Sequence, residues 1–334
     1  MKQVVLSRVL SAAPVADDFE MATAADPTLP AGGLLVRTVY LSLDPYVGST
    51  MRGRHMGAPA SVVGDVPPGV SVAQVIASDA AGFSAGDWVV AETGWRELAG
   101  IPAQGVRKID PSIAPLSTHI GVLGMPGLTG FAGAVRLGAA REGDVVLVSA
   151  AAGAVGGTFG QIAKIHGAAK VVGIAGGPEK CKLVTDTYGF DACVDYKQDG
   201  WQEHIAKETG GKINLYIENV GTQTLNIAMA NLAVNGRVVL CGLTAHYHGD
   251  GPPAQMSVGM IVGKRAHVMG LVVYDFYGEQ ASYAAQAAQW IKDGKLAYLE
   301  DIGDGLESAP AMMAKLMEGR NIGKALVKVG PESL

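Results

Sequence analysis

The strongest chemical signal in the sequence is a run of small residues that joins an apolar segment to a segment of helical period. The apolar segment is VVLVS at 145–149, and AAAGAVGG follows it directly. Ala150, Gly153 and Gly156 have the A-x-x-G-x-x-G spacing of a dinucleotide-binding turn, in which a pyrophosphate reaches the N–H groups at the start of a helix. A glycine-rich loop alone is weak evidence in a chain with 46 glycines. Its place between a strand and a helix favours a nucleotide site.

The end of the next apolar segment, 171–175, bears on which nicotinamide cofactor would bind. An NAD enzyme usually carries Asp or Glu about 20 residues beyond the glycines, where the carboxylate binds the ribose 2′-hydroxyl. Here the sequence reads AGGP at 175–178, and Glu179 and Lys180 follow. The small residues leave room for a 2′-phosphate, and Lys180 could bind it from the first turn of a helix. NADP(H) is favoured, although Lys180 could be a surface lysine and Glu179 argues against it unless it faces away.

Cysteine and histidine give no sign of a metal site or of export. Cys181, Cys193 and Cys241 are too few for a disulfide framework, and none has the spacing of a zinc ligand. The N-terminal apolar run is too short for a signal peptide and soon meets acidic residues. We therefore expect no bound metal and a reducing, cytoplasmic location.

The apolar pattern predicts two kinds of fold along the chain. Up to about residue 120, short extended segments alternate with Pro- and Gly-rich turns, as in an all-β domain. From about 122 to 295, buried strands alternate with helices, which is the pattern of a doubly wound parallel sheet of the α/β class. A last helix and strand, 309–318 and 324–329, are assigned to the β domain. The expected domains are therefore 1–121 with 296–334, and 122–295.

Composition excludes several partners. The formal charge is −5 and only 17% of residues are charged, below the roughly 25% of an average globular protein. No basic surface is expected for a polyphosphate chain. Two long uncharged stretches, 111–135 and 145–163, are interrupted by Pro or Gly and are interpreted as core rather than as membrane spans. We expect neither nucleic acid nor a membrane as a partner.

Several longer segments, in order along the chain, resemble a known family: SLDPY, ETGWRE, GVLGMPGLTG, AAGAVGGTFGQIAKIHG, VVGIAGGPEKC, ENVG, VVLCG and GRNIGK. They are similar to the zinc-independent medium-chain dehydrogenase/reductases, and within these to the leukotriene B and prostaglandin reductase group, which includes curcumin reductase. The resemblance spans residues 36 to 329. It implies a GroES-like β domain built from both ends of the chain, a Rossmann domain that binds NADPH, and a homodimer.

The resemblance also implies which residues contact NADPH. They are Ala154, Val155, Gly156 and Gly157 at the pyrophosphate, Lys180 and Tyr196 near the 2′-phosphate, Asn219, the segment that contains Cys241, Gly242, Leu243 and Tyr247, then Leu271, Val272 and Val273 beside the nicotinamide, and Asn321. Three of these have simpler interpretations. Tyr196 could serve packing, Cys241 could be present for its size, and Asn321 could be a turn residue.

One departure concerns the substrate side. The family pattern continues from Asp44-Pro45-Tyr46 directly to Met-Arg-Gly, whereas this chain inserts VGST at 47–50 before Met51. We expect a longer or shifted loop there, so substrate identity is not transferred.

The implied reaction is reduction of a carbon–carbon double bond conjugated to a carbonyl in a small molecule. Hydride reaches the β-carbon, and charge develops on the carbonyl oxygen as an enolate. Such a step needs a hydrogen-bond donor at that oxygen and no metal. Tyr247, Tyr46 and Tyr274 are the candidate donors. Tyr247 ranks first because it follows the expected strand 238–242 at the carboxyl edge of the sheet.

Other polar residues near these tyrosines have open roles. His246 and His248 could move protons or be exposed loop residues, and Arg52 and Arg54 could bind an anionic substrate tail or be surface arginines. The favoured function is an NADPH-dependent reductase of α,β-unsaturated ketones and aldehydes. The alternatives are a quinone or alcohol oxidoreductase on the same scaffold and a non-catalytic NADPH-binding protein.

Overall fold

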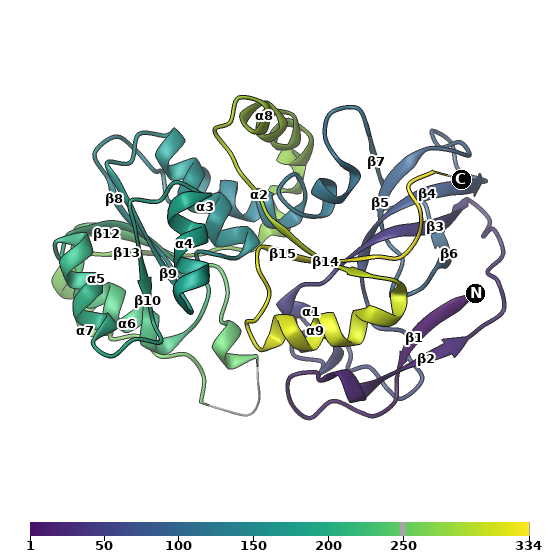
Figure 1. Cartoon of the computed structure of the whole chain (residues 1–334), viewed down its shortest axis with the longest axis horizontal. Helices are drawn as coiled ribbons and strands as arrows, with labels where there is room; N and C mark the ends of the chain where they lie inside the picture. The colour runs from purple at the N-terminus through teal and green to yellow at the C-terminus, as the bar shows by residue number, and fades with distance from the viewer. Residues whose placement is uncertain (248–251, 334) are drawn as a thin grey trace. The chain divides into compact units, whose positions relative to one another are not determined.

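The computed structural model describes residues 1–247 and 252–333, which form two compact units (Figure 1). The first unit contains Met1–Gly121, Tyr247 and the segment from Glu300 onward. The second contains Val122–His246 and residues 252–299. The sequence placed Tyr247 in the Rossmann domain and began the C-terminal segment at residue 296, so the contacts differ from those boundaries at both places.

The second unit is built on a parallel sheet of six strands in the order β10-β9-β8-β11-β12-β13. This is the strand order of a Rossmann fold, which confirms the predicted fold class. The strands are β8 (Val145–Val148), β9 (Lys170–Ala175), β10 (Ala192–Asp195), β11 (Ile213–Glu218), β12 (Leu232–Leu240) and β13 (His267–Gly270). The helices are α2 (Met125–Phe131), α3 (Ala154–Ile165), α4 (Pro178–Asp186), α5 (Trp201–Thr209), α6 (Thr222–Ala230), α7 (Val258–Lys264) and α8 (Gln280–Lys292).

Helices cover both faces of this sheet, and β9 shows how its sequence serves both. Val172 and Ile174 point into a core that also contains side chains of α5 and α6. Gly173 faces the other way, and a Cβ there would lie 2.8 Å from the Val184 side chain of α4. Because alternate residues of a strand face opposite sides, a strand buried on both sides is apolar or small at every position.

The first unit is a β domain. Its larger sheet runs β14-β15-β3-β4-β5-β7, with β6 also paired to β3, and a separate pair joins β1 to β2. The C-terminal strand β15 pairs antiparallel with β3, so the two ends of the chain share one sheet. This matches the GroES-like domain that the resemblance implied. The strands are β1 (Lys2–Leu6), β2 (Phe19–Thr23), β3 (Gly33–Ser42), β4 (Val70–Ser78), β5 (Trp88–Glu92), β6 (Leu98–Pro102), β7 (Arg107–Ile109), β14 (Glu300–Asp304) and β15 (Lys324–Lys328).

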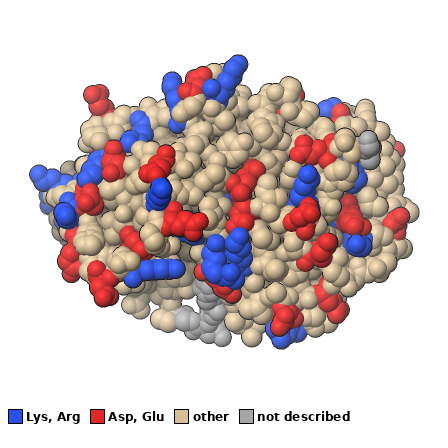
Figure 2. Space-filling model, in the orientation of Figure 1, with Lys and Arg blue, Asp and Glu red and all other residues tan. Residues whose placement is uncertain are grey.

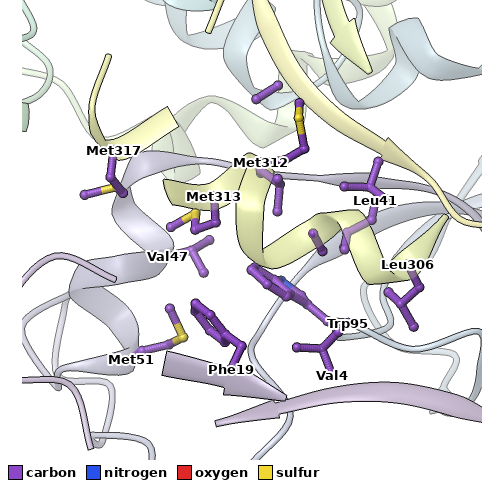
Figure 3. Packing of buried hydrophobic residues seen from close by; sticks show 14 of the residues in the cluster. Val4, Phe19, Leu41, Val47, Met51, Trp95, Leu306, Met312, Met313 and Met317 are labelled. Carbon is purple, nitrogen blue, oxygen red and sulfur yellow. The ribbon is translucent and has the colours of Figure 1, made fainter. Parts of the chain in front are cut away.

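A methionine- and aromatic-rich core joins the ends of the chain in this unit (Figure 3). Trp95 is fully buried and stacks on Phe19, with ring centroids 5.1 Å apart. Met312 and Met313 reach the same cluster from α9 (Ala309–Met317). Flexible thioether side chains suit the irregular space around two aromatic rings.

The inserted residues 47–50 belong to this core and not to an extended loop. They lie in α1 (Pro45–Met51), which begins with Pro45 at a position where its missing N–H costs no hydrogen bond. Val47 and Met51 are buried in the cluster. These four residues make up about one turn of the packed helix. The expectation of a longer or shifted loop rested on the insertion relative to the family pattern alone, and the structure corrects it, because residues 45–51 form a helix whose inner side is buried.

A buried ion pair fixes the start of α1. Lys324 of β15 donates to the Asp44 carboxylate at 2.9 Å and to the Leu43 carbonyl at 2.6 Å, and Ser42 also donates to Asp44. Burial lowers the pKa of Lys324, while the charge of Asp44 opposes that lowering. Two family-like segments, SLDPY and GRNIGK, are thus joined by one ion pair although they lie 280 residues apart.

Acidic and basic side chains are intermingled on the face of the protein seen in Figure 2. No helix in the described part of the chain is long and apolar enough to cross a membrane.

Candidate active site

The carboxyl ends of the parallel strands carry most of the predicted cofactor residues. β8 and β11 are neighbours, and from them the strand order continues in opposite directions. Loops that leave such a pair diverge, and ligands of Rossmann folds bind in the crevice that results. The glycine turn follows β8, and Asn219 follows β11.

The glycine turn has the close packing that its sequence predicted. Ala150 has a positive φ of 49°, which costs an L-residue about 1 kcal/mol or more. Gly153 caps α3, and its N–H donates to the Ala150 carbonyl at 2.9 Å. A Cβ on Gly156 would lie 2.5 Å from that carbonyl oxygen. Any larger residue at 156 would therefore push the turn away from the helix.

Two further glycines of α3 have a packing role that the sequence did not reveal. A Cβ on Gly157 would lie 2.6 Å from the Tyr188 ring, and one on Gly160 would lie 2.0 Å from the Phe190 ring. The N–H of Gly157 already donates to the Gly153 carbonyl. The first-turn N–H groups of Ala154, Val155 and Gly156 are those that point beyond the start of a helix.

The residues predicted for the 2′-phosphate follow two neighbouring strands, Lys180 after β9 and Tyr196 after β10. A Cβ on Gly176 would lie 2.7 Å from the hydroxyl of Tyr196, so only glycine lets that ring lie against the turn. Lys180 is half-buried in the first turn of α4, whereas Glu179 is exposed. Tyr196 is 47% exposed, which is more than a purely packing role requires.

Asp195 is a carboxylate at this tip that the sequence analysis missed. Its Oδ1 accepts the N–H of Gly177 at 2.7 Å and that of Lys197 at 3.0 Å. Burial acts to raise the pKa of Asp195, but these hydrogen bonds outweigh it and the pKa is lowered. Asp195 belongs to β10, so a search along the chain from the glycines does not reach it.

Asn219 connects three loops at the diverging strands. Its side-chain amide donates to the Ser149 carbonyl at 3.0 Å, and its backbone N–H donates to the Ser149 hydroxyl at 2.7 Å. Its own carbonyl accepts hydrogen bonds from the N–H and the hydroxyl of Thr244. The loop after β12, which contains the predicted Cys241, Gly242 and Leu243, therefore lies over the end of β11.

Glu218, the last residue of β11, holds this loop cluster and was also missed. Its buried carboxylate accepts hydrogen bonds from Tyr216 at 2.6 Å, from Thr224 at 2.9 Å and from the N–H of Gly221 at 3.0 Å. Burial raises the pKa of Glu218, and the hydrogen bonds oppose that rise. Its backbone carbonyl accepts from the N–H groups of Cys241 and Gly242. The sequence showed only a hydrophobic strand that ends in ENVG.

The remaining predicted cofactor residues are less uniform. Burial raises the pKa of the Cys241 thiol to about 12, which keeps it neutral. Leu271 is buried, and Val272 and Val273 follow it at the start of a short 3₁₀ helix, η5 (Val273–Glu279). The side chain of Asn321 in the first unit donates to the Gly323 carbonyl, which is a turn-forming contact.

The three candidate tyrosines lie in different surroundings. Tyr46 and Tyr247 both pack, partly buried, against the core of the first unit. Tyr274 belongs to the second unit and is 44% exposed, with its ring 5.5 Å from that of Tyr277. Tyr247 was expected with the Rossmann domain because it follows β12 in sequence. Tyr247 packs instead against the core of the first unit, which is why it belongs to that unit.

Arg52 and His246 are fixed by hydrogen bonds to the backbone. Arg52 is buried at the end of α1 and donates to the carbonyls of Gly48 and Tyr247, so it is not a surface arginine. The Nδ1 of His246 lies 3.0 Å from the Pro252 carbonyl oxygen. Arg54 is exposed, and His248 lies outside the described residues.

Two family models match the chain. Residues 2–109 match the N-terminal domain of oxidoreductase, and residues 154–293 match the zinc-binding dehydrogenase family. These matches correspond to the two units, one to each.

Full-length relatives define the group more narrowly. The NADPH-dependent curcumin reductase of Escherichia coli is 35% identical and covers 95% of this chain and 93% of its own length. The 2-alkenal reductase (NADP(+)-dependent) of Nicotiana tabacum is 36% identical, over 99% of this chain and 98% of its own length. The crystal structure of CurA from Vibrio vulnificus in complex with NADPH is 38% identical, covers 99% of this chain and 100% of that one, and has a TM-score of 0.92.

The chain belongs to the medium-chain dehydrogenase/reductases, in the group of the prostaglandin, alkenal and curcumin reductases. The family predicted from the short segments is thereby confirmed. One of the two matching family models is named for zinc binding. Across residues 1–247 and 252–333, no group of three or more His, Cys, Asp or Glu side chains could hold a metal ion.

We predict that Glu218→Gln destabilises the reductase fold by about 1–3 kcal/mol. The carboxylate accepts hydrogen bonds only, whereas a glutamine amide would direct one N–H group at hydroxyl and N–H donors. Urea denaturation measures the loss, and amide exchange at Val220 and Gly221 should become faster. Glu203→Gln, at an exposed position of α5, is the control. Equal stability of the two variants would contradict the role given to Glu218.

Proposed function

We propose that this protein is an NADPH-dependent reductase of the carbon–carbon double bond of α,β-unsaturated ketones and aldehydes. The observation that carries the proposal is full-length similarity to a curcumin reductase and a 2-alkenal reductase that both use NADP(H). The chain's own cofactor turn and the tip of β9 agree with it. In this proposal the second unit binds NADPH and the first supplies the substrate side.

The residues present fit NADPH. Gly156 packs against the Ala150 carbonyl with no room for a Cβ, and this tight turn would bring a pyrophosphate to the first-turn N–H groups of α3. Lys180, in the first turn of α4, and Tyr196, whose hydroxyl lies close to Gly176, would bind the 2′-phosphate. Asn219 and the loop at 241–243 would line the nicotinamide end, together with Leu271, Val272 and Val273.

NADPH supplies the hydride that reaches the β-carbon of the substrate. The protein must then stabilise the enolate oxygen, where negative charge develops, with a hydrogen-bond donor. A neutral phenol can do this at pH 7, because its ordinary pKa is about 10. Tyr247 remains the first candidate, with Tyr46 and Tyr274 as alternatives.

The structure adds a reason to retain Tyr247. The Arg52 side chain donates to the backbone carbonyl of Tyr247, which restrains Tyr247. Arg52 is therefore a positioning residue in this proposal, in place of a ligand for an anionic substrate tail. Tyr46, at the other end of the same helix α1, packs against the same core as Tyr247.

The proposal extends to assembly and location. By resemblance to its group the enzyme would act as a homodimer. The small number of cysteines supports a cytoplasmic location.

The decisive test is transient kinetics of bound NADPH oxidation against a panel of enones, enals, quinones and saturated aldehydes. We expect rapid oxidation with enones and enals only, and a saturated ketone or aldehyde as the product by mass spectrometry. Reaction with quinones alone would assign the quinone reductase function instead. Tight NADPH binding without oxidation by any compound would indicate a non-catalytic binding protein.

A second prediction concerns cofactor choice. Lys180→Ala should weaken NADPH binding by about 1.5–3 kcal/mol, the range for a hydrogen bond to a charged group, and leave NADH binding unchanged. Fluorescence titration with each cofactor measures both affinities. Lys182→Ala, two residues further along α4 and exposed, is the matched control. If the unmutated protein binds NADPH and NADH equally, the 2′-phosphate site is wrong.

The third prediction concerns the donor. Tyr247→Phe removes one hydrogen bond made chiefly in the transition state, so kcat should fall about 10²–10³-fold while NADPH affinity changes little. Tyr46→Phe and Tyr274→Phe are the comparisons. Loss of activity in one of these and not in Tyr247→Phe would move the role to that residue. Full activity of all three variants would exclude a tyrosine donor.

A further inference from the structure

Two of the three cysteines, Cys181 and Cys193, are in contact. Cys181 is in the first turns of α4, and Cys193 is on β10, the edge strand beside β9. The Cys193 thiol donates to the Cys181 sulfur, and the two Sγ atoms are 2.8 Å apart. A disulfide bond is about 2.05 Å long, so the sulfurs need to approach by less than 1 Å to form one.

The register of the sheet explains why these side chains meet. Cys193 pairs with Gly173 of β9, and a Cβ on Gly173 would contact the Val184 side chain of α4. The face of β10 that carries Cys193 is therefore the face that α4 covers. Val194, the next residue, points into the opposite core. The contact is built by the packing of a helix on a strand and does not depend on a loop.

Asp195 makes a second connection between the same two elements. It lies two residues after Cys193, and its carboxylate accepts the N–H of Gly177, which caps α4. The start of α4 is thus attached to β10 at two points, one a carboxylate and one a pair of thiols.

We propose that Cys181 and Cys193 form a reversible disulfide that joins the first turns of α4 to β10. Both residues are partly exposed, so a small oxidant can reach them. The oxidant is a low-molecular-weight disulfide such as glutathione disulfide. Cytoplasmic disulfides of this kind are usually transient and redox-sensing.

The two cysteines have different roles in the exchange. The hydrogen bond from Cys193 lowers the pKa of Cys181, whereas the same bond and burial raise the pKa of Cys193. Cys181 also lies near the start of α4, where the helix dipole favours a thiolate, and it accepts the hydrogen bond from Cys193, so we assign it as the attacking thiolate and Cys193 as the resolving thiol.

The reaction balances as two successive exchanges. The Cys181 thiolate attacks one sulfur of glutathione disulfide, the S–S bond breaks, and one glutathione thiolate leaves. Cys193 then gives up its proton, its sulfur attacks that of Cys181, and the second glutathione leaves. Two cysteine thiols are oxidised by two electrons, and glutathione disulfide is reduced to two glutathione thiols that take up the two protons.

A consequence for the cofactor follows, and this step rests on the proposed function. Lys180 precedes Cys181, and Tyr196 follows Asp195, so the disulfide would connect the two segments that are proposed to bind the 2′-phosphate. The disulfide would restrain the first turns of α4, which carry Lys180. The oxidised protein should therefore bind NADPH several-fold more tightly and NADH as before, because NADH has no 2′-phosphate.

The first test is oxidation of the full-length protein in glutathione buffers, with thiol counting and intact-mass measurement. Of the three thiols in the sequence, two should disappear together, and the intact mass should show no glutathione attached to the protein. Dithiothreitol should restore both thiols. Peptide mapping should identify the bond as Cys181–Cys193. Loss of a single thiol as a stable adduct, or a bond that includes Cys241 or a second molecule, would overturn the proposal.

Single serine variants separate the two roles. Cys193→Ser should accumulate a mixed disulfide with glutathione on Cys181, whereas Cys181→Ser should stay reduced over the same time. The opposite pattern would contradict the assignment of the attacking thiol. The unmutated protein's thiol count stands independently if either variant fails to fold.

Cofactor titration of the reduced and oxidised proteins tests the consequence. Equal changes for NADPH and NADH would contradict a link to the 2′-phosphate. A protein that forms the disulfide and binds neither cofactor would refute the proposed function and leave the redox site intact. A protein that binds NADPH and never forms the disulfide would refute the redox site and leave the proposed function intact.

Discussion

The arrangement of the candidate site depends on one constraint, which is that all six strands of the Rossmann sheet run parallel. Their carboxyl ends therefore meet at one edge, and segments separated by tens of residues become neighbours there. Ser149 after β8 and Asn219 after β11 touch because of this. The loop after β12 bonds to Glu218 and Asn219 for the same reason. Glycine at 156 and 176 lets the turns at this edge pack closely, since a Cβ at either would collide with the backbone or a tyrosine.

In the first unit, the larger sheet includes strands from both ends of the chain, so distant segments must be held together. A single buried ion pair, Lys324 with Asp44, anchors the late segment to the early one. A buried charge without its partner would cost several kcal/mol, so this pair specifies one arrangement of the two segments even where it adds little net stability. Through Asp44 it also fixes the start of α1, the helix that carries Tyr46 and ends at Arg52.

Elements with clear punctuation were predictable from the sequence. The helix expected at 309–318 and the strand expected at 324–329 are observed as α9 (Ala309–Met317) and β15 (Lys324–Lys328), each within one residue of the prediction. The helix α1 (Pro45–Met51), which contains the inserted residues, could not be predicted in this way. Its burial is decided by α9 and Pro14, which are distant in sequence. Glu218 was missed for a related reason. A carboxylate at the end of an apolar strand looks solvated until Tyr216, Thr224 and Gly221 are seen to surround it.

Asp195 shows why cofactor choice is a matter of hydrogen bonding and not only of residue type. A carboxylate does lie at the tip of β9, contributed by the neighbouring strand, and one with free acceptors could bind a ribose 2′-hydroxyl, as in NAD enzymes. Its Oδ1, however, accepts two backbone N–H groups, and Gln198 donates to Oδ2. Its acceptors are thus engaged in stabilising the Gly176-Gly177 turn, while Lys180 in the first turn of α4 carries the opposite charge. The same carboxylate that would select against NADPH as a free acceptor instead shapes the turn on which the phosphate would rest.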